Sequence, residues 1–363
     1  IHASNSVISW PAILAHHPHL PYAYVAETRG TLDEEPPAPM KDVFTDFPVG
    51  TQLGVVDYTE PTAPVIVQNF RAGINLQSVS VNSTGNLLVT GSTEKGKELA
   101  VAPLINGLID TIYYFTDSLI TDRRPRDDGL RNLVFHPRRN IIAANLNGES
   151  VTFYRVHDGE GELRVERIGA PVAVGKKLSV GHWHPTGNFF LVTDVNWGDG
   201  SLGAVLNGKG SMVSVRFAAD GRHRIAGQVK TGKSPEGFDL SPDGRYAVAV
   251  NMERTYLPKN FWFIPGRKTA SLSLIEIDPD TGTLRTLGKR YGFAGALPED
   301  AAFDAESNTL AVAVYHARDA VAPRRGWIEF WELTDEALQK TETRVEVTRG
   351  VHNLLLVPPK QHP

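Results

Sequence analysis

The stretch FDLSPDGRYAVAV, residues 238–250, decides the fold because its pattern recurs along the chain. A few apolar residues precede a Pro-Asp-Gly turn, and an apolar run suited to a β-strand follows it. The related stretches are LAHHPHLPYAYVA (14–26), VSVNSTGNLLVT (79–90), LVFHPRRNIIAA (133–144), HWHPTGNFFLV (182–192), AAFDAESNTLAVAV (301–314) and HNLLLVPP (352–359). Such recurrence indicates repeated supersecondary units.

The spacing of the copies indicates how large each unit is. Their turn residues stand from 48 residues apart, between Pro137 and Pro185, to 65 residues apart, between Pro18 and Ser83. After the turn of the opening stretch, three further strands are predicted over residues 246–250, 271–277 and 284–290. Four-stranded antiparallel units repeated radially form a β-propeller. We therefore predict an all-β protein, a β-propeller of four-stranded antiparallel blades, with residues 1–363 as a single domain; a solenoid, the alternative, would have shorter and more uniform repeats.

The number of blades depends on the two ends of the chain. Seven inner strands can be counted, but only six complete sets of outer strands follow them. Seven blades are favoured over six if the C-terminal strand HNLLLVPP closes the ring beside SVISW, residues 6–10. Two positions before the turn, six copies carry a large apolar residue, predicted to lie in the core between blades. These residues are Val81, Phe135, Trp183, Leu240, Phe303 and Leu356.

Composition narrows the possible functions. Lys and Arg number 37 and Asp and Glu 41, so the net charge of −4 argues against nucleic acid as a partner. The sequence contains no run of 18 apolar residues, so no membrane span is predicted. Cysteine is absent, which excludes disulfides, thiolate catalysis and zinc held by cysteine. The chain starts at Ile1 instead of Met, so we expect that an upstream segment was removed; the compartment and the oligomeric state stay open.

Alignment of the seven copies separates the scaffold from candidate chemistry. Polar residues that differ from copy to copy are not explained by the repeat. Six positions before the turn, at the start of each inner strand, stand Ala12, Gln77, Arg131, Ser179, Glu236, Glu299 and His352. The next position adds Ser78, Asn132, Asp300 and Asn353. The long loops after the second strands should lie at the same face, because those strands run antiparallel to the first, and we predict a site at that mouth of the channel.

The residues at this mouth suggest acid–base chemistry. Crowded carboxylates raise one another's pKa values, so a catalytic set of Glu236, Glu299, His352 and Asp300 could supply a proton donor and a base. Arg131 would hold a substrate carboxylate or phosphate. The other predicted substrate-binding residues are Gln77, Asn132, Ser179 and Asn353 on the inner strands and Trp197, Arg254, Tyr256 and His316 on the loops. The alternative is that these side chains only hydrogen-bond one another across a water-filled channel.

Two histidines invite a metal-binding interpretation. His182 and His184 stand two apart in a predicted strand and so share a face. However, His184 directly precedes the turn proline, as His17 and His136 do, and this indicates a role in supporting the turn. The sequence places no third ligand. We predict neither a metal nor a cofactor, because the chain also has no P-loop, GxSxG or dinucleotide-binding fingerprint.

The phrases SPDGRYAVAVN (241–251) and HPTGNFFLVTDVNWGDG (184–200) resemble the lactonase-type β-propellers, the group of 6-phosphogluconolactonase and the fungal carboxymuconate-lactonizing enzymes. The resemblance runs from about Pro18 to Pro358. Ser179 and Glu236 stand where that family typically has Pro-His and Pro-Arg, whereas Asp300 matches a family Asp. The resemblance implies a lactonase, or a related lyase, cyclase or isomerase that moves protons with carboxylates.

Two functions are therefore expected. The first is an enzyme acting on a small carboxylated or lactone-like metabolite at the channel mouth, by lactone hydrolysis, cyclisation or isomerisation. The alternative is a non-catalytic β-propeller that uses its long rim loops as a binding or scaffold protein. Carboxylates deep at the starts of the inner strands favour the enzyme, because a protein-binding rim would not require them.

Overall fold

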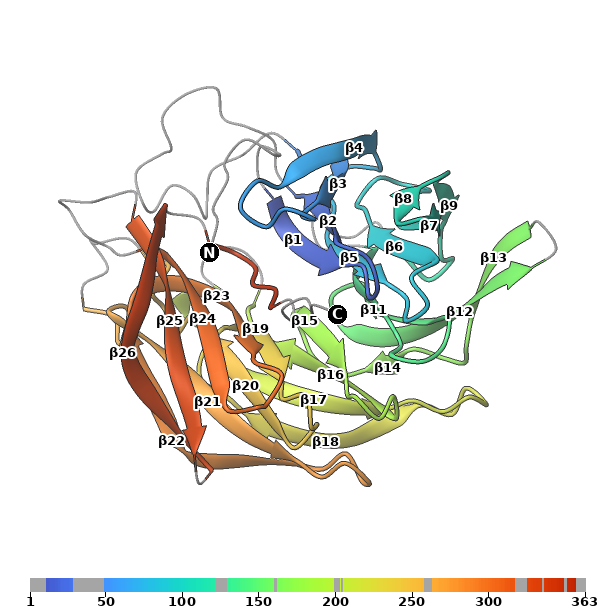
Figure 1. Ribbon diagram of the computed structural model, residues 1–363. Coiled ribbons are helices and arrows are strands. Elements are labelled where there is room, and N and C mark those ends of the chain that lie inside the picture. The colour runs from blue at the N-terminus through green and yellow to red at the C-terminus, as the bar shows by residue number, and fades with distance from the viewer. Residues whose placement is uncertain are drawn as a thin grey trace. The chain divides into compact units, whose positions relative to one another are not determined.

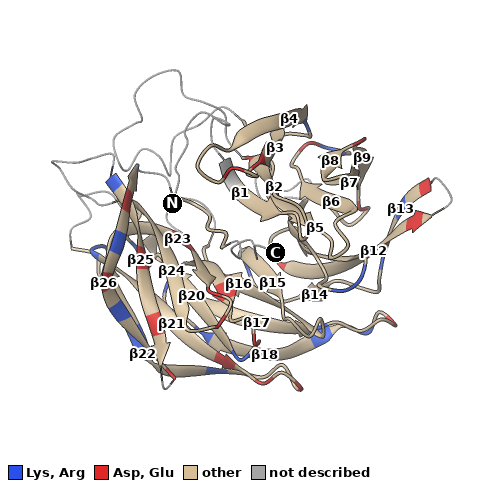
Figure 2. Cartoon of the chain, viewed as in Figure 1, with Lys and Arg blue, Asp and Glu red and all other residues tan. Residues whose placement is uncertain are grey.

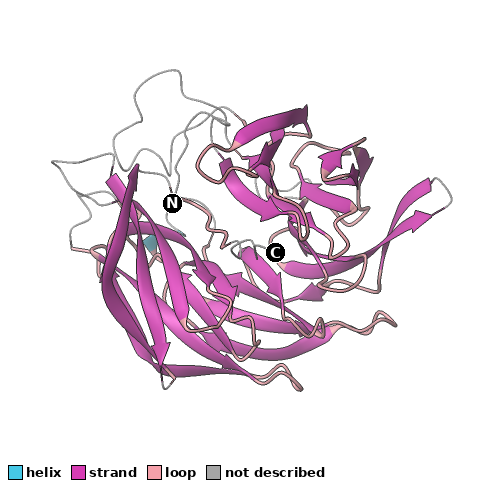
Figure 3. Ribbon diagram, viewed as in Figure 1, coloured by secondary structure: helices cyan, strands magenta, loops and turns pink. Residues whose placement is uncertain are grey.

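The computed structural model is built almost entirely of β-strands (Figures 1 and 3). It describes residues 11–28, 49–121, 129–159, 162–198, 203, 205–257, 263–316, 325–334, 336–348 and 351–356. Within these residues the strands form six antiparallel sheets, each following a four-strand path in sequence order. The prediction of an all-β, propeller-type fold of four-stranded blades is confirmed. The described residues include no helix with the length and apolar character needed to cross a membrane.

The chain divides into two compact units. Unit 1 comprises residues 1–36, 45–190 and 215–225, and unit 2 comprises residues 37–44, 191–214 and 226–363. The fourth sheet has strands β15 (Leu178–Trp183), β16 (Phe189–Asp194), β17 (Ser211–Arg216) and β18 (Arg224–Lys230), whose residues are divided between the two units. The single domain expected over residues 1–363 stays a prediction.

Unit 1 contains the first three sheets. The first consists of β1 (Pro11–His16), β2 (Tyr22–Glu27), β3 (Gln52–Asp57) and β4 (Val65–Arg71). The second consists of β5 (Ser78–Val81), β6 (Leu87–Gly91), β7 (Leu99–Ile105) and β8 (Leu108–Ile109), and β9 (Tyr113–Phe115) also pairs with β7. The third consists of β10 (Leu130–Phe135), β11 (Ile141–Leu146), β12 (Ser150–Gly159) and β13 (Glu162–Arg167), and β14 (Val172–Ala173) also pairs with β12.

Unit 2 contains the fifth and sixth sheets. The fifth consists of β19 (Pro235–Leu240), β20 (Tyr246–Asn251), β21 (Thr269–Ile277) and β22 (Leu284–Ala294). The sixth consists of β23 (Ala296–Phe303), β24 (Thr309–His316), β25 (Arg325–Thr334) and β26 (Ala337–Thr348). The strands predicted after the opening stretch, residues 246–250, 271–277 and 284–290, are confirmed as β20, β21 and β22. Each of them begins or ends a few residues from the predicted bounds.

The second strand of a blade is buried on both faces. In β6, Leu88 belongs to an apolar core shared with Tyr24 of the first sheet. Its neighbours Leu87 and Val89 belong to a core shared with Phe135 of the third sheet. Side chains alternate between the faces of a strand, so a strand covered on both sides must be apolar at every position. This explains the continuous apolar run that follows each turn in the sequence.

The same packing recurs in unit 2. Val248 and Leu272 of the fifth sheet share a core with Phe303, Val312 and Trp331 of the sixth. The outer strand β26, by contrast, carries exposed side chains of both signs (Figure 2). These are Lys340, Glu342, Arg344 and Glu346. The fourth strand is thus the solvated edge of this blade, where mixed charges are compatible with a sheet edge.

The seventh blade is not formed by the described residues. Of the predicted core column, Phe135, Trp183, Leu240 and Phe303 are buried and Val81 is partly buried. Leu356, from the C-terminal copy, is 45% exposed. Residues 351–356 belong to no strand, and both SVISW and residues 357–363 lie outside the described residues. The C-terminal copy therefore follows the repeat in sequence without adopting its structure over residues 351–356.

Two histidines support the turns of unit 1, as predicted. The Nδ1 atom of His136 accepts a hydrogen bond from the Arg138 amide at 3.0 Å, so the ring proton is on Nε2. Nε2 donates to the carbonyl oxygen of Gly187 in the next turn, also at 3.0 Å. His17 makes the same bond to Gly85. Burial lowers the pKa of His136 to about 4, which keeps the ring neutral in this role.

The turn glycine is required by this contact as well as by its backbone conformation. Gly187 has φ +73°, and a Cβ there would overlap the His136 ring. Gly96 has a similar φ of +79°, but a Cβ there would have open space around it. We expect Gly96→Ala to lower the free energy of unfolding by about 1–2 kcal/mol through backbone strain alone. Gly187→Ala should cost about 1–3 kcal/mol more through overpacking.

A double-mutant cycle isolates the histidine contact. In a His136→Ala background, Gly187→Ala should cost no more than Gly96→Ala, because the overlapping ring is gone. Urea denaturation of the unmodified chain and of the four variants measures all of these differences: Gly96→Ala, Gly187→Ala, His136→Ala and the double variant. An extra cost of Gly187→Ala that persists without the His136 ring would show that backbone strain, and not the histidine, is responsible.

Candidate functional site

Glu236 lies near the start of the inner strand β19, and Glu299 lies within the neighbouring inner strand β23, where the pairing of β23 with β24 shifts register. Gly237, which follows Glu236 in β19, approaches the β23 backbone so closely that a Cβ would overlap the carbonyl oxygen of Glu299. Only glycine permits this approach. The structure thus brings together the parts of β19 and β23 that carry the two predicted catalytic carboxylates. We call Glu236, Glu299, Asp300, His352 and Asn353 the β19–β23 site.

The C-terminal segment places an imidazole beside Glu299. His352 Nε2 lies 3.8 Å from Glu299 Oε2, within ion-pair range but longer than a hydrogen bond. The Glu299 side chain is 10% exposed and that of His352 35% exposed, so solvent reaches the imidazole more readily than the carboxylate. A carboxylate and an imidazole at this separation can share a proton through one water molecule. This pair is therefore suited to acid–base chemistry.

Asp300 anchors the segment that carries His352. Its Oδ2 accepts hydrogen bonds from Asn353 Nδ2 at 2.6 Å and from the Leu354 amide at 2.9 Å. Burial raises the pKa of Asp300 to about 8; the amide of Leu354 opposes this rise and the charge of Asp239 adds to it. Asp300 therefore carries a proton at neutral pH. A like charge contributes, but it is that of Asp239 and not that of Glu236 or Glu299, and burial is the larger cause.

Asp239 is a further carboxylate close to this site, and no pattern in the sequence predicted it. Its oxygens accept hydrogen bonds from the amides of Leu240 and Phe303, both at 2.8 Å. Burial raises the pKa of Asp239 to about 6 despite these two bonds. Asp239 stands in the middle of β19, at a position where the other copies carry unrelated residues. Only the packing of β19 against β23 places it close enough to influence Asp300.

The loop residues Trp197, Arg254 and Tyr256 gather around Ser234. The indole Nε1 of Trp197 donates to Ser234 Oγ at 2.8 Å, and the Tyr256 hydroxyl lies 3.3 Å from the same oxygen. The Trp197 and Tyr256 rings are 5.3 Å apart. Asn207 Nδ2 also donates to Ser234 Oγ, at 2.7 Å. Ser234 has φ +50°, an uncommon conformation for serine that these contacts hold in place.

The remaining loop residues differ in exposure. Arg254 is partly exposed, and its guanidinium donates to Asn207. Tyr256 is fully buried, and burial raises the pKa of its hydroxyl. His316 is buried at the end of β24, where its pairing partner is Ala296. Of these, only Arg254 has the partial exposure expected of a side chain that closes over a ligand.

Ser234 and Asn207 were missed by sequence reasoning. Asn207 lies in a glycine-rich loop without a motif, and Ser234 stands one position before the strand that holds the polar column. Asn207 is nevertheless buried, and Ser234 is fully so. No pattern in the sequence indicates that a loop between β16 and β17 returns to the start of β19.

The predicted binding residues of unit 1 hydrogen-bond to one another's strands. Arg131 Nε and Nη2 donate to Gln77 Oε1 at 3.1 and 2.6 Å. Asn132 Nδ2 donates to the Gly181 carbonyl at 3.3 Å, and the Ser179 carbonyl accepts from Asn145 at 2.5 Å. These contacts link neighbouring sheets, which fits the alternative in which the polar side chains hydrogen-bond within the channel. The role of Arg131 as an anion holder stays a prediction.

The part of the chain that the structure describes has no group of three or more His, Asp or Glu side chains that could hold a metal ion. Burial lowers the pKa of His182 to about 4, so this ring is neutral. His184 Nδ1 lies 2.8 Å from Thr186 Oγ1. It also accepts a hydrogen bond from the Thr186 amide at 3.2 Å, within its own turn. His184 thus supports its turn as His17 and His136 do.

The fold is similar to those of known lactonase structures. The periplasmic gluconolactonase of Pseudomonas aeruginosa, PpgL, superposes with a TM-score of 0.67 at 16% identity, over 97% of this chain and 87% of that one. A candidate 6-phosphogluconolactonase of Bacteroides uniformis has a TM-score of 0.65 at 15% identity, over 94% of this chain and 86% of that one. This chain has a lactonase-type fold. The resemblance seen in the sequence is confirmed at that level.

Proteins with other roles share the same architecture. Sqt1 of Chaetomium thermophilum, in a structure bound to the N-terminus of ribosomal protein L10, has a TM-score of 0.54 at 13% identity, over 96% of this chain and 77% of that one. No protein-family model matches the chain, and no curated protein matches its sequence. At these identities the comparisons show the fold and leave activity to be argued from the site.

The raised pKa of Asp300 predicts a pH-dependent stability. Between pH 4 and 8 the folded chain holds a proton on Asp300 that the unfolded chain, with a pKa near 3.8, has released. The contribution of Asp300 to the free energy of unfolding should therefore fall as the pH rises, by up to about 1.4 kcal/mol per pH unit, and level off above pH 8. Asp300→Asn should remove this contribution. Urea denaturation between pH 6.5 and 8 measures the loss, because Asp239, with a pKa of about 6, has largely titrated below that range.

A surface aspartate serves as the control. Asp278 is exposed, and amide hydrogen bonds in its hairpin lower its pKa, so its titration falls below this window. Asp278→Asn should leave the slope between pH 5 and 8 unchanged. An Asp300→Asn protein with the slope of the unmodified chain would show that Asp300 is ionised in the folded state at neutral pH.

Proposed function

We propose that the protein is a lactone-type hydrolase that uses the β19–β23 site. The observation that carries this proposal is the Glu299–His352 pair, with 3.8 Å between Oε2 and Nε2, next to a second carboxylate-bearing strand start. The lactonase-type fold supports the same reaction class, because two similar structures are described as lactonases. Hydrolysis is preferred to cyclisation or isomerisation on that ground.

The proposed reaction needs a base, an acid and one water molecule. Glu299 takes a proton from water while His352, beside it, orients the water. The resulting hydroxide forms a bond to the lactone carbonyl carbon. Collapse of the tetrahedral intermediate breaks the ring C–O bond, and the leaving oxygen takes a proton from Glu236 on the neighbouring strand. The product is a hydroxy acid, and transfer of the proton from Glu299 to Glu236 through solvent restores the site.

Asp300 acts through His352 in this scheme. It holds the Asn353 side chain and the Leu354 amide, the two residues that follow His352. Asp300 is therefore a positioning residue. Its proton at neutral pH removes a negative charge that would otherwise repel the carboxylate of Asp239.

Substitution of the two glutamates tests the proposal. Glu299→Gln and Glu236→Gln keep the side-chain shape but cannot exchange a proton, so kcat/KM should fall by about 10²- to 10⁴-fold. Turnover of a panel of aldonolactones is followed by acid release in a pH-stat, and folding is checked by the melting temperature. Glu276→Gln is the matched control and should retain full activity, because this partly exposed glutamate of β21 pairs with Arg285 outside the site.

The outcomes separate the enzyme from the binding alternative. Full activity in both site variants would remove Glu236 and Glu299 from the mechanism. Absence of turnover by the unmodified protein across the panel would contradict the hydrolase. In that case the non-catalytic binding role would be the better account. The structure of Sqt1 bound to the N-terminus of ribosomal protein L10 supports that role.

A further inference from the structure

Two cationic side chains of unit 2 converge on one neutral oxygen. Lys233 Nζ donates to the backbone carbonyl of Asn207 at 2.7 Å, and Arg254 Nη2 donates to the same oxygen at 3.1 Å. The two nitrogen atoms are therefore no farther apart than the sum of these distances. Arg254 Nε also donates to Asn207 Oδ1 at 3.2 Å, and Nη1 to the Pro265 carbonyl at 3.4 Å. All of these acceptors are uncharged.

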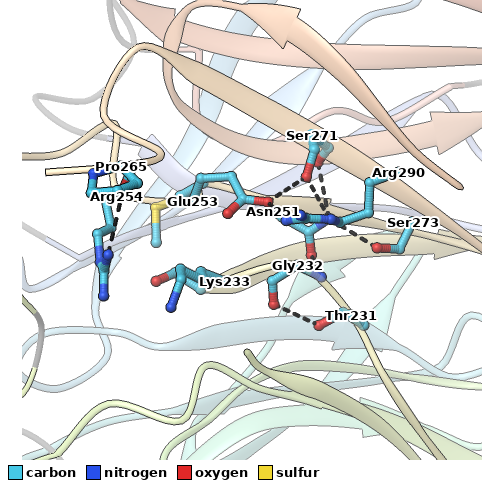
Figure 4. A network of polar contacts seen from close by, with 12 residues as sticks. Thr231, Gly232, Lys233, Asn251, Glu253, Arg254, Pro265, Ser271, Ser273 and Arg290 are labelled. Carbon is cyan, nitrogen blue, oxygen red and sulfur yellow. Dashed lines mark hydrogen bonds and ion pairs between the residues drawn. The ribbon is translucent and has the colours of Figure 1, made fainter. Parts of the chain in front are cut away.

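The nearest carboxylate is engaged elsewhere. Glu253 Oε1 forms an ion pair with Arg290 Nη1 at 2.6 Å and accepts from Ser271 Oγ at 2.7 Å. In Figure 4, Arg254 lies at one end of this polar network and Arg290 at the other. Among the residues that the structure describes, neither Lys233 nor Arg254 has a carboxylate within ion-pair distance. Within the described residues, the charge of Glu253 reaches Lys233 but is shared with Arg290, which forms the direct ion pair.

Both side chains have more N–H groups than they use in these hydrogen bonds. Lysine has three N–H groups, of which Lys233 uses one, and arginine has five, of which Arg254 uses three. Both residues are partly exposed, so these donors can be reached from solvent. Burial lowers the pKa of Lys233, and the charge of Arg254 lowers it further. The free protein therefore holds two like charges together at an energetic cost.

Hydrogen bonds hold the residues around these two cations in place. Asn207 is buried and donates to the buried Ser234. The Arg254 amide donates to the Gly266 carbonyl at 2.9 Å. Thr255 Oγ1 donates to the Met252 carbonyl at 2.7 Å. The donors are therefore held in place before any ligand arrives, which lowers the ordering cost of binding.

We propose that Lys233 and Arg254 form a binding site for a small oxyanion, a carboxylate or a phosphate group. The oxyanion would accept hydrogen bonds from the ammonium and from the guanidinium and would neutralise the repulsion between them. The site is a property of the folded chain and does not depend on the proposed hydrolysis.

Thermal-shift titration at constant ionic strength tests this site. Inorganic phosphate in one arm and acetate in the other replace chloride, and a ligand that binds only the folded chain raises the melting temperature in a saturable way. The arm that saturates at the lower concentration identifies the preferred group. Lys233→Met should weaken the binding at least tenfold. Arg254→Lys should weaken it less, because the charge remains while the planar fork of donors is lost.

The matched control is Lys230→Met, a lysine of β18 that is exposed and carries no part of the site. It should bind the anion as the unmodified protein does, which separates a specific site from general charge screening. The proposal is overturned if neither anion gives a saturable shift, or if Lys233→Met and Lys230→Met behave alike. No lactone enters the titration, so a negative result here leaves the proposed hydrolase untouched, and a failed hydrolase leaves this result standing.

Discussion

The structure depends on the burial of both faces of each blade's second strand. Leu87, Leu88 and Val89 of β6 show the principle, because consecutive side chains enter two different cores. A polar side chain in this position needs a hydrogen-bond partner within the protein, as Thr90 of β6 has in the Ser78 carbonyl. Most positions of these strands are therefore apolar. The polar groups of unit 2 lie instead mainly in its loops and along the inner strands β19 and β23.

Close packing of these inner strands creates the electrostatics of the site. Gly237 lets β19 approach Glu299, and the same packing brings Asp239 near Asp300. Burial then favours the neutral form of Asp300, while Glu299, still partly open to solvent, stands next to His352. Two adjacent carboxyl groups thus have different environments. Such a difference is how neighbouring acids acquire different roles in catalysis.

The repeat allowed the strands to be predicted from the sequence. The site could be predicted only in part, because some of its residues lie in loops. The Pro-Asp-Gly turn and the run after it predicted β20 nearly to its bounds, because turn chemistry and two-sided burial are local properties. The column of strand starts predicted that Glu236 and Glu299 would be neighbours. The sequence could not show that Asn207 folds back to Ser234, or that Asp239 influences Asp300, because both depend on contacts between distant segments. The C-terminal copy was predicted to form an inner strand because its residues fit the repeat. Residues 351–356 form no strand, and they place His352 beside Glu299.

Tyr256 connects the two parts of unit 2 that carry chemistry. Burial is the main reason for the raised pKa of its hydroxyl, but the charge of Arg254 lowers that pKa and the charge of Glu236 raises it. The hydroxyl therefore lies within electrostatic reach of both the oxyanion site and the β19–β23 site. An anion bound to Lys233 and Arg254 would offset the positive charge that lowers this pKa. Occupancy of the oxyanion site would therefore raise the pKa of the Tyr256 hydroxyl through charge alone, without any movement of the strands.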